Sequence, residues 1–143
     1  MSQLREIRTS LEVGFPEGAL PEVFVRFQGR QTRSIGAVAE FPYEDGQFDA
    51  VLMDGSAVSA KAVREAHRVL RPEGQLLFVV QERTKKQDGY TLPDIYKIVR
   101  EGFNITEVMR PAWWFFGLRG RTISICATKK AWKAVTNTFR PYV

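Results

Sequence analysis

The chain has 143 residues, of which 44% are apolar and 26% are charged, and its formal net charge is +5. This length allows one domain with a sizeable core, and no apolar run approaches the ~20 residues that a membrane-spanning helix needs. We therefore expect one domain without a membrane segment, made up of a shortened N-terminal part (1–35), a core (36–128) and a C-terminal tail (129–143).

The N-terminus has no feature of a secretory signal, because Met1-Ser-Gln-Leu-Arg-Glu6 contains no apolar segment. A cytoplasmic location is therefore expected. Apolar and polar residues then alternate in two stretches, Ile7–Phe15 and Val23–Phe27, and Pro16–Pro21 lies between them. Such alternation is typical of antiparallel strands with one solvent-exposed face, so this pattern favours a β-hairpin over residues 7–28.

The middle of the chain predicts a strand, a helix and a second strand. Phe48–Met53 is a short continuous apolar run, as expected of a strand that is covered on both faces. Apolar residues then recur at helical spacing from Val58 to Leu70, and a serine, Ser56 or Ser59, is placed to cap the helix. A proline and a glycine end this helix, and the apolar run Leu76–Val80 is the next strand.

The last third predicts one more helix and two strands. A capping-box signature, Thr91 with Asp94, opens the helix. Phe103–Met109 and Arg121–Thr128 follow as strands joined without a helix, and Cys126 is expected to be a buried, unreactive thiol in the second of them. Alternating strands and helices imply a parallel sheet with helices on its faces, and the last two strands form an antiparallel hairpin.

Two phrases of the sequence resemble a known family. Glu40-Phe-Pro-Tyr-Glu-Asp-Gly-Gln-Phe-Asp49 is similar to the Leu-Pro-Phe-Pro-Asp-Gly-Ser-Phe-Asp phrase that precedes the fourth strand in class I S-adenosylmethionine (SAM)-dependent methyltransferases of the type 11 kind. Val69-Leu-Arg-Pro-Glu-Gly74 is similar to the phrase that opens their fifth strand, and the resemblance covers roughly residues 36–128. It implies an α/β fold with a reduced Rossmann-like class I methyltransferase sheet, helices on its faces and a C-terminal antiparallel β-hairpin.

The resemblance also implies where SAM would bind, without a metal ion. Leu11–Gly18 resembles the family's glycine-rich turn after the first strand, and Gly36–Glu40 resembles the phrase near the adenine. The cofactor-binding residues that follow from these matches and from the end of the fourth strand are Glu12, Gly14, Gly18, Val38 and Asp54. An aspartate before a glycine is also a common turn or helix-cap residue, so Asp54 has a purely structural alternative.

The chain departs from the family in the half that would hold the cofactor. The turn contains bulky, rigid and charged residues where small, flexible ones are usual: Phe15, Pro16 and Glu17. No acidic residue in Arg30–Ser34 is available for the ribose hydroxyls, and Ala37 replaces the family's aspartate. Only 27 positions separate Gly14 from Phe41, so at least one βαβ unit, which needs roughly 30 residues, is missing or collapsed. The N-terminal third is therefore either a remnant of the first strand and its turn or the hairpin.

The C-terminal third is aromatic and basic. Trp113, Trp114 and Phe116 are candidates for lining a substrate pocket or forming an interface, because adjacent large aromatics cannot all face one core. Basic residues mixed with aromatics also occur on nucleic-acid-binding surfaces, although a solvated face is the commoner explanation.

Three functions remain open at this point. In the first, the chain is a SAM-dependent methyltransferase-like protein with impaired or lost cofactor binding, and it acts as a binding or assembly module, as a homo-oligomer that covers its shortened sheet edge. In the second, it is an active, minimal SAM-dependent methyltransferase with a small-molecule substrate. In the third, it binds nucleic acid through its basic C-terminal third.

Overall fold

The structure is a computed structural model that describes residues 7–16, 20, 22–25, 27–83, 85, 88–109 and 122–130. The strands are β1 (Thr9–Val13), β2 (Gln31–Ile35), β3 (Phe48–Asp54), β4 (Leu70–Gln81), β5 (Phe103–Met109) and β6 (Thr122–Lys129). The helices are α1 (Glu22–Val25), the 3-10 helix η1 (Gly55–Ala57), α2 (Ala60–Val69) and α3 (Leu92–Val99). None of the helices in these ranges is long and apolar enough to cross a membrane.

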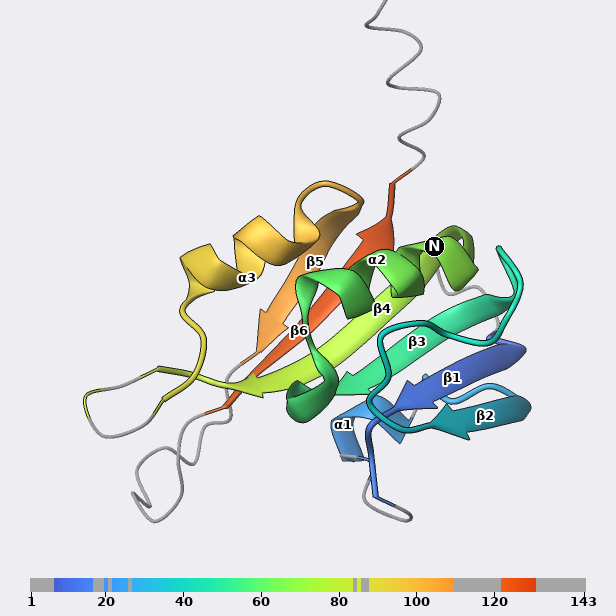
Figure 1. The fold of residues 1–143 in the computed structure, drawn as a ribbon, viewed down its shortest axis with the longest axis horizontal. Coiled ribbons are helices and arrows are strands. Elements are labelled where there is room, and N and C mark those ends of the chain that lie inside the picture. Colours follow the sequence, from blue (N-terminus) through green and yellow to red (C-terminus); the bar gives the residue numbers. More distant parts are fainter. Residues whose placement is uncertain are drawn as a thin grey trace, which may run out of the picture.

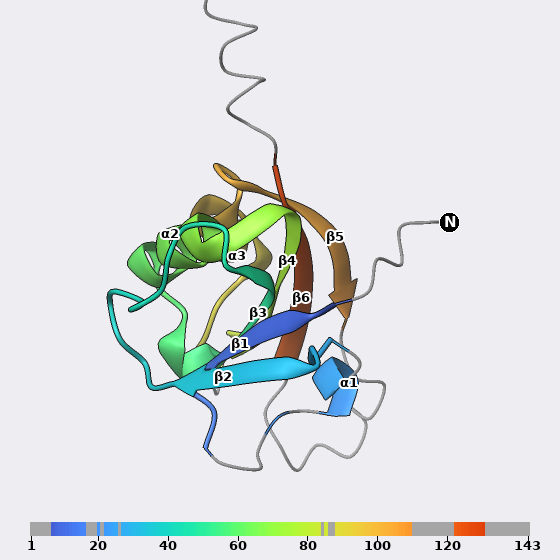
Figure 2. The same cartoon turned by 90° about the vertical axis from the view of Figure 1, so that its right-hand side faces the viewer.

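All six strands form one sheet in the order β2-β1-β3-β4-β6-β5 (Figure 1). The strands β1 to β4 are parallel to one another, and β6 is antiparallel to both β4 and β5. Helices α2 and α3 cover one face, and the four-residue helix α1 lies on the other (Figure 2). These features confirm the predicted α/β fold, with a parallel sheet that ends in an antiparallel hairpin.

The two helices on the same face begin as the sequence predicts. Ser59 caps α2 by accepting a hydrogen bond from the backbone N–H of Ala62, with Oγ and N 3.0 Å apart. Thr91 and Asp94 form the predicted capping box at the start of α3. The apolar side of α2 is buried in the larger of two core clusters, together with side chains of β1, β3 and β4. Packing of these apolar faces on the sheet stabilises both helices.

The predicted N-terminal hairpin is wrong. β1 is parallel to both β2 and β3 and lies between them, so both of its edges are hydrogen-bonded to parallel neighbours. Ser10, on the face expected to contact solvent, is fully buried. The predicted strand at Val23–Phe27 is also wrong, because the chain there forms α1, which buries Phe24 and leaves Val25 49% exposed. The second interpretation, a first strand followed by a glycine turn, is confirmed.

One βαβ unit is missing, as the spacing predicts. Residues 36–47 connect β2 to β3 without a helix. Dinucleotide-binding sheets usually have the strand order 3-2-1-4-5-6, so in this sheet one strand fewer lies on the β2 side of β1. Consequently β2 is an edge strand, and β1 and β3 form the point at which the strand order reverses.

Glu73 lies in strained backbone, because its φ of +66° falls in the left-handed region. The family phrase that Val69–Gly74 resembles, Val-Leu-Arg-Pro-Gly-Gly, has glycine at this position. We expect Glu73→Gly to raise the free energy of unfolding by up to about 1 kcal/mol, since glycine adopts this conformation without steric cost. Gly46→Ala, at φ +67° with open space around it, is the matched opposite and should lower that free energy by a similar amount. Urea denaturation measures both changes, and a loss of stability in Glu73→Gly would contradict the strain.

Candidate functional site

Ligands of open parallel sheets bind at the carboxyl ends of the strands where the strand order reverses. Here those ends belong to β1 and β3, which the chain leaves at Gly14 and Asp54. The two residues lie side by side, since a Cβ built on Gly14 would be 3.6 Å from the Cβ of Asp54. Glu12 lies between Leu52 of β3 and Ser34 of β2 in the sheet register. The structure therefore brings together Glu12, Gly14 and Asp54, three of the predicted cofactor residues.

Gly14 makes a tight contact with the protein itself. Its φ is +82°, and its N–H donates to the carbonyl oxygen of Ile35 over 2.9 Å. A Cβ at this position would lie 2.9 Å from the Cβ of Ala57, closer than real Cβ atoms approach one another. The glycine is thus required for packing against η1.

Asp54 acts as the N-cap of η1. Its Oδ2 accepts hydrogen bonds from the backbone N–H of Ser56, at 3.2 Å, and from the hydroxyl of Ser56. Gly55, which follows, packs against β4, because a Cβ there would be 2.6 Å from the carbonyl oxygen of Val79. These contacts bear out the structural alternative for Asp54.

The residues around the turn are also engaged with the protein. Glu12 accepts a hydrogen bond from the side-chain amide of Gln28, with Nε2 and Oε2 2.6 Å apart. Phe15 packs on the smaller core cluster, which contains Phe24 and Leu77, and Pro16 follows it on the surface. The bulk of Phe15 is therefore directed into a packed region, whereas Pro16 is exposed.

The other predicted site residues do not complete a pocket around Gly14. Val38 is 45% exposed in the segment that follows β2, and Gly36 has open space around it. The sequence contains no Asp or Glu from Gly29 to Ala39. Four further candidates, Gly18, Trp113, Trp114 and Phe116, lie outside the described residues.

SAM in its usual position does not fit these residues well. Gly14 packs too closely against Ala57 to accept a Cβ, the Asp54 carboxylate caps η1, and β2 ends without an acid for the ribose. Within the part of the chain that the structure describes, no group of three or more His, Cys, Asp or Glu side chains could hold a metal ion. The described residues therefore occupy the position of a cofactor site, and the end of the glycine turn, with Gly18, lies outside them.

Arg68, which directly precedes the second of the two phrases that carry the family resemblance, binds the first phrase. Its guanidinium donates to the carbonyl oxygens of Tyr43 and Phe41, at 2.8 and 2.9 Å, and forms ion pairs with Glu65 and Asp45. Glu65 also accepts from the backbone N–H of Phe41 at 2.8 Å. The hydrogen bond from Arg68 lowers the pKa of Glu65 and raises that of Arg68 itself. The loop before β3 is thereby fixed to α2.

A second ion pair connects the same phrases at the start of β3. Arg71 donates to Asp49 over 2.7 Å, and Asp49 also accepts from the backbone N–H groups of Arg8 and Thr9. Burial opposes the charged form of Asp49, but these hydrogen bonds outweigh it and lower the pKa of the carboxyl group. This structural role was not predicted from the sequence. The acidic residues of the first phrase and the arginine of the second, Arg71, were a usable signal for it.

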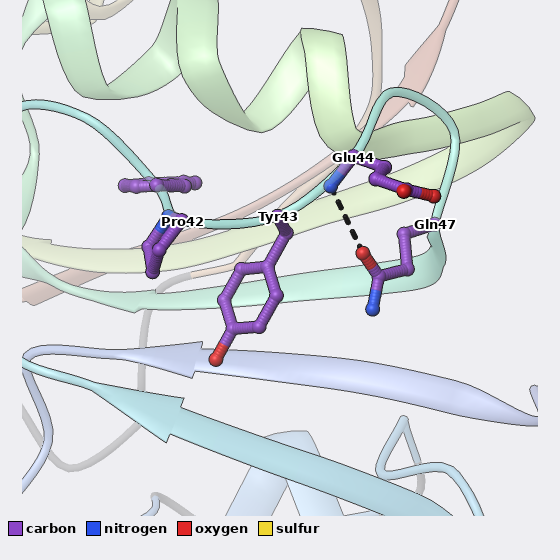
Figure 3. Close-up of a pocket in the computed structure, with 5 residues that line it drawn as sticks. Pro42, Tyr43, Glu44 and Gln47 are labelled. Atoms are coloured by element: carbon purple, nitrogen blue, oxygen red, sulfur yellow. Dashed lines mark hydrogen bonds between the residues drawn. The ribbon is translucent and has the colours of Figure 1, made fainter.

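A hollow of about 650 Å³ lies at the same loop, lined by Phe41, Pro42, Tyr43, Glu44 and Gln47. In Figure 3 the Tyr43 side chain extends from the loop toward the ribbons of β1 and β2, and the backbone N–H of Glu44 donates to the Gln47 side chain. Gln47 directly precedes β3, whereas Asp54 ends it. The hollow is therefore at the other end of β3 from Asp54.

His67 is held neutral by packing. Its ring lies edge-on to Phe103, with ring centroids 5.4 Å apart, and Gly102 leaves the space it occupies. Burial, and next the charge of Lys129, lower the pKa of His67 to about 4. The folded state therefore resists protonation that the unfolded chain accepts near pH 6.5.

Stability should consequently fall as the pH drops from about 7.5 to 5, because only the unfolded state then gains this proton. We expect a loss of about 1–2 kcal/mol, smaller than full burial would give because the ring is partly exposed. Urea unfolding at several pH values measures it. The carboxyl groups with lowered pKa titrate below this window, so His67→Gln should flatten the profile. An unchanged slope in His67→Gln would contradict the assignment.

The chain matches one family model in sequence and several solved proteins in structure. Residues 11–78 match the family model described as a methyltransferase domain. A SAM-dependent methyltransferase from Thermotoga maritima is similar in structure, with 18% identity, coverage of 90% of this chain and 84% of that one, and a TM-score of 0.62. One from Methanosarcina mazei has 13% identity, coverage of 89% and 94%, and a TM-score of 0.60. The [4+2]-cyclase SpnF has 16% identity, coverage of 89% and 77%, and a TM-score of 0.63. No curated protein sequence matches the chain.

Proposed function

Because this chain has the fold of the class I SAM-dependent methyltransferases, and its residues 11–78 match a methyltransferase domain, we propose that it is a methyltransferase-like binding module that no longer holds SAM in the usual way. One observation carries the proposal, namely the contact between Gly14 and Ala57. Because Gly14 packs this closely on the protein's own η1, little room is left beside it for a cofactor to approach its backbone.

Two further features support lost cofactor binding. Phe15 and Pro16 replace the small residues of the turn, and the proline removes a backbone N–H that could donate to a ligand. The β2 strand ends at Ile35 with no carboxylate for the ribose hydroxyls. The similarity to SpnF, a [4+2]-cyclase, is in keeping with this fold serving purposes other than methyl transfer.

An active minimal methyltransferase is the second candidate, because Glu12, Gly14 and Asp54 do meet where the strand order reverses. In that case Glu12 and Asp54 would contact SAM, after releasing Gln28 and Ser56. Nucleic-acid binding is supported less. Most of the basic C-terminal third lies outside the described residues, and the ammonium groups of Lys129 and Lys130 donate to backbone carbonyls.

Thermal unfolding with and without cofactor separates the first two candidates. A ligand present at 100 times its dissociation constant stabilises the folded state by about 2.7 kcal/mol, which shifts the melting temperature by several degrees. The proposal predicts a shift below about 1 °C with 1 mM SAM or S-adenosylhomocysteine. A shift of several degrees that disappears in Asp54→Ala would support the active methyltransferase instead.

A further inference from the structure

The outer edge of β2 is open. β2 is the terminal strand of the sheet, and its first four residues, Gln31 to Ser34, are all exposed (Figure 2). Successive residues of a strand point to opposite faces, so neither face of β2 is covered at these positions. Only Ile35, at the end of the strand, packs partly against the core.

The backbone of β2 offers hydrogen bonds to a further strand. The N–H of Gln31 donates to the carbonyl oxygen of Arg8, and the carbonyl of Ile35 accepts from Gly14, so both residues face β1. In a parallel ladder, alternate residues direct their N–H and C=O groups to opposite sides. Thr32 and Ser34 therefore direct theirs to the open edge.

The two edges of the sheet are protected to different degrees. β5, at the far edge, has a bulge between Ile105 and Glu107 and carries an exposed acidic residue there. Bulges and charges of this kind prevent a strand from pairing with other chains. β2 pairs with β1 in unbroken register from Gln31 to Ile35 and contains no proline or lysine. Its outer edge is accordingly the one suited to accept a strand.

The charge around β2 selects the partner. Gly29–Ala39 contains two arginines and no acidic residue, and Arg8 lies next to the start of β2. Within the part of the chain that the structure describes, Arg33 forms no ion pair, and it is exposed in the middle of the strand. A second copy would bring the same positive charges to the seam, and like charges on neighbouring strands repel.

We propose that the β2 edge binds an extended acidic segment of another protein, which adds to the sheet beside β2 and places a carboxylate opposite Arg33. Main-chain hydrogen bonds to Thr32 and Ser34 supply the pairing, and the charge pair supplies the selectivity. The inference concerns the outer edge and not the turn at Gly14. It therefore stands whether or not SAM binds.

Fluorescence anisotropy with a labelled peptide of sequence Ser-Thr-Val-Glu-Val-Glu-Val-Thr-Ser tests the proposal on the full chain. We expect this peptide to bind at least about tenfold more tightly than its counterpart with lysine in place of glutamate, and binding should weaken as salt rises. Ser34→Pro removes an outward N–H that pairs with nothing in the sheet, so it should keep the fold and weaken peptide binding about tenfold or more. Arg33→Glu should reverse the preference to the lysine peptide.

Several results would overturn the proposal. One is the absence of binding up to about 1 mM acidic peptide, and another is equal affinity for both peptides. Unchanged affinity in Ser34→Pro, with Arg33→Glu also unchanged, would exclude the β2 edge. Analytical ultracentrifugation of the chain without peptide measures its oligomeric state. A dimer without peptide that Ser34→Pro dissociates would assign the edge to a second copy of the chain.

Discussion

Replacing Arg68 by alanine should lower the free energy of unfolding by about 2–4 kcal/mol, because charged hydrogen bonds are lost and their partners remain partly buried. The guanidinium satisfies two loop carbonyls, those of Phe41 and Tyr43, and neutralises Glu65. Among the described residues, Arg68 is the only charged side chain that donates to these two carbonyl oxygens. Chemical denaturation followed by circular dichroism measures the change.

Two variants test whether the geometry of Arg68 matters. Arg64→Ala changes the same residue type on the exposed side of α2, and should alter the free energy of unfolding by less than about 0.5 kcal/mol. Arg68→Lys keeps the charge but loses the planar set of donors, so it should recover less than half of the loss. Equal stability of Arg68→Ala and Arg64→Ala would contradict the structural role.

Gly14→Ala is expected to cost about 2–3 kcal/mol of folding stability, from the left-handed φ and from the clash with Ala57. Gly36→Ala is the matched control. Gly36 has open space around it, so that substitution should be close to neutral. Melting curves of the purified variants without any ligand measure both.

The clash can also be relieved from the other side. In Gly14→Ala combined with Ala57→Gly, the two side chains no longer meet, so part of the lost stability should return as a favourable coupling. The strained φ remains, so recovery is incomplete. A Gly14→Ala protein that is as stable as the unchanged chain would mean that the turn has room for a ligand after all.

The part of the fold that could be predicted is the part whose local signals and packing agree. Ser59 and the Thr91–Asp94 capping box start helices in both the sequence and the structure. The apolar runs of β3 and β4 are buried strands, as expected. In these elements the hydrophobic pattern, the caps and the tertiary environment favour the same conformation.

The N-terminal third could not be predicted because its pattern is ambiguous. Alternation from Ile7 to Phe15 favours an antiparallel strand, but β1 is a central parallel strand that buries the small polar Ser10 within the sheet. In the short segment after it, Phe24 is the buried residue of a single helical turn, which a period of two cannot indicate. Tertiary contacts decided both elements.

The position of the candidate site could be predicted from the sequence, but the packing around Gly14 could not. Gly14 and Asp54 do lie together where the strand order reverses, as the resemblance implies. What the sequence could not reveal is that Ala57 fills the space beside Gly14, since no local pattern relates these two residues. The first phrase is held in place by Arg68 and is bound to the second by the ion pair between Asp49 and Arg71. Residues of a family signature can therefore also stabilise the fold.

Isothermal titration calorimetry with SAM and S-adenosylhomocysteine tests lost cofactor binding most directly. The proposal predicts no saturable heat from either ligand, that is, no binding tighter than about 100 μM. Saturable binding tighter than this, weakened by Asp54→Ala and retained in Arg64→Ala, would contradict it and would assign the site to the cofactor.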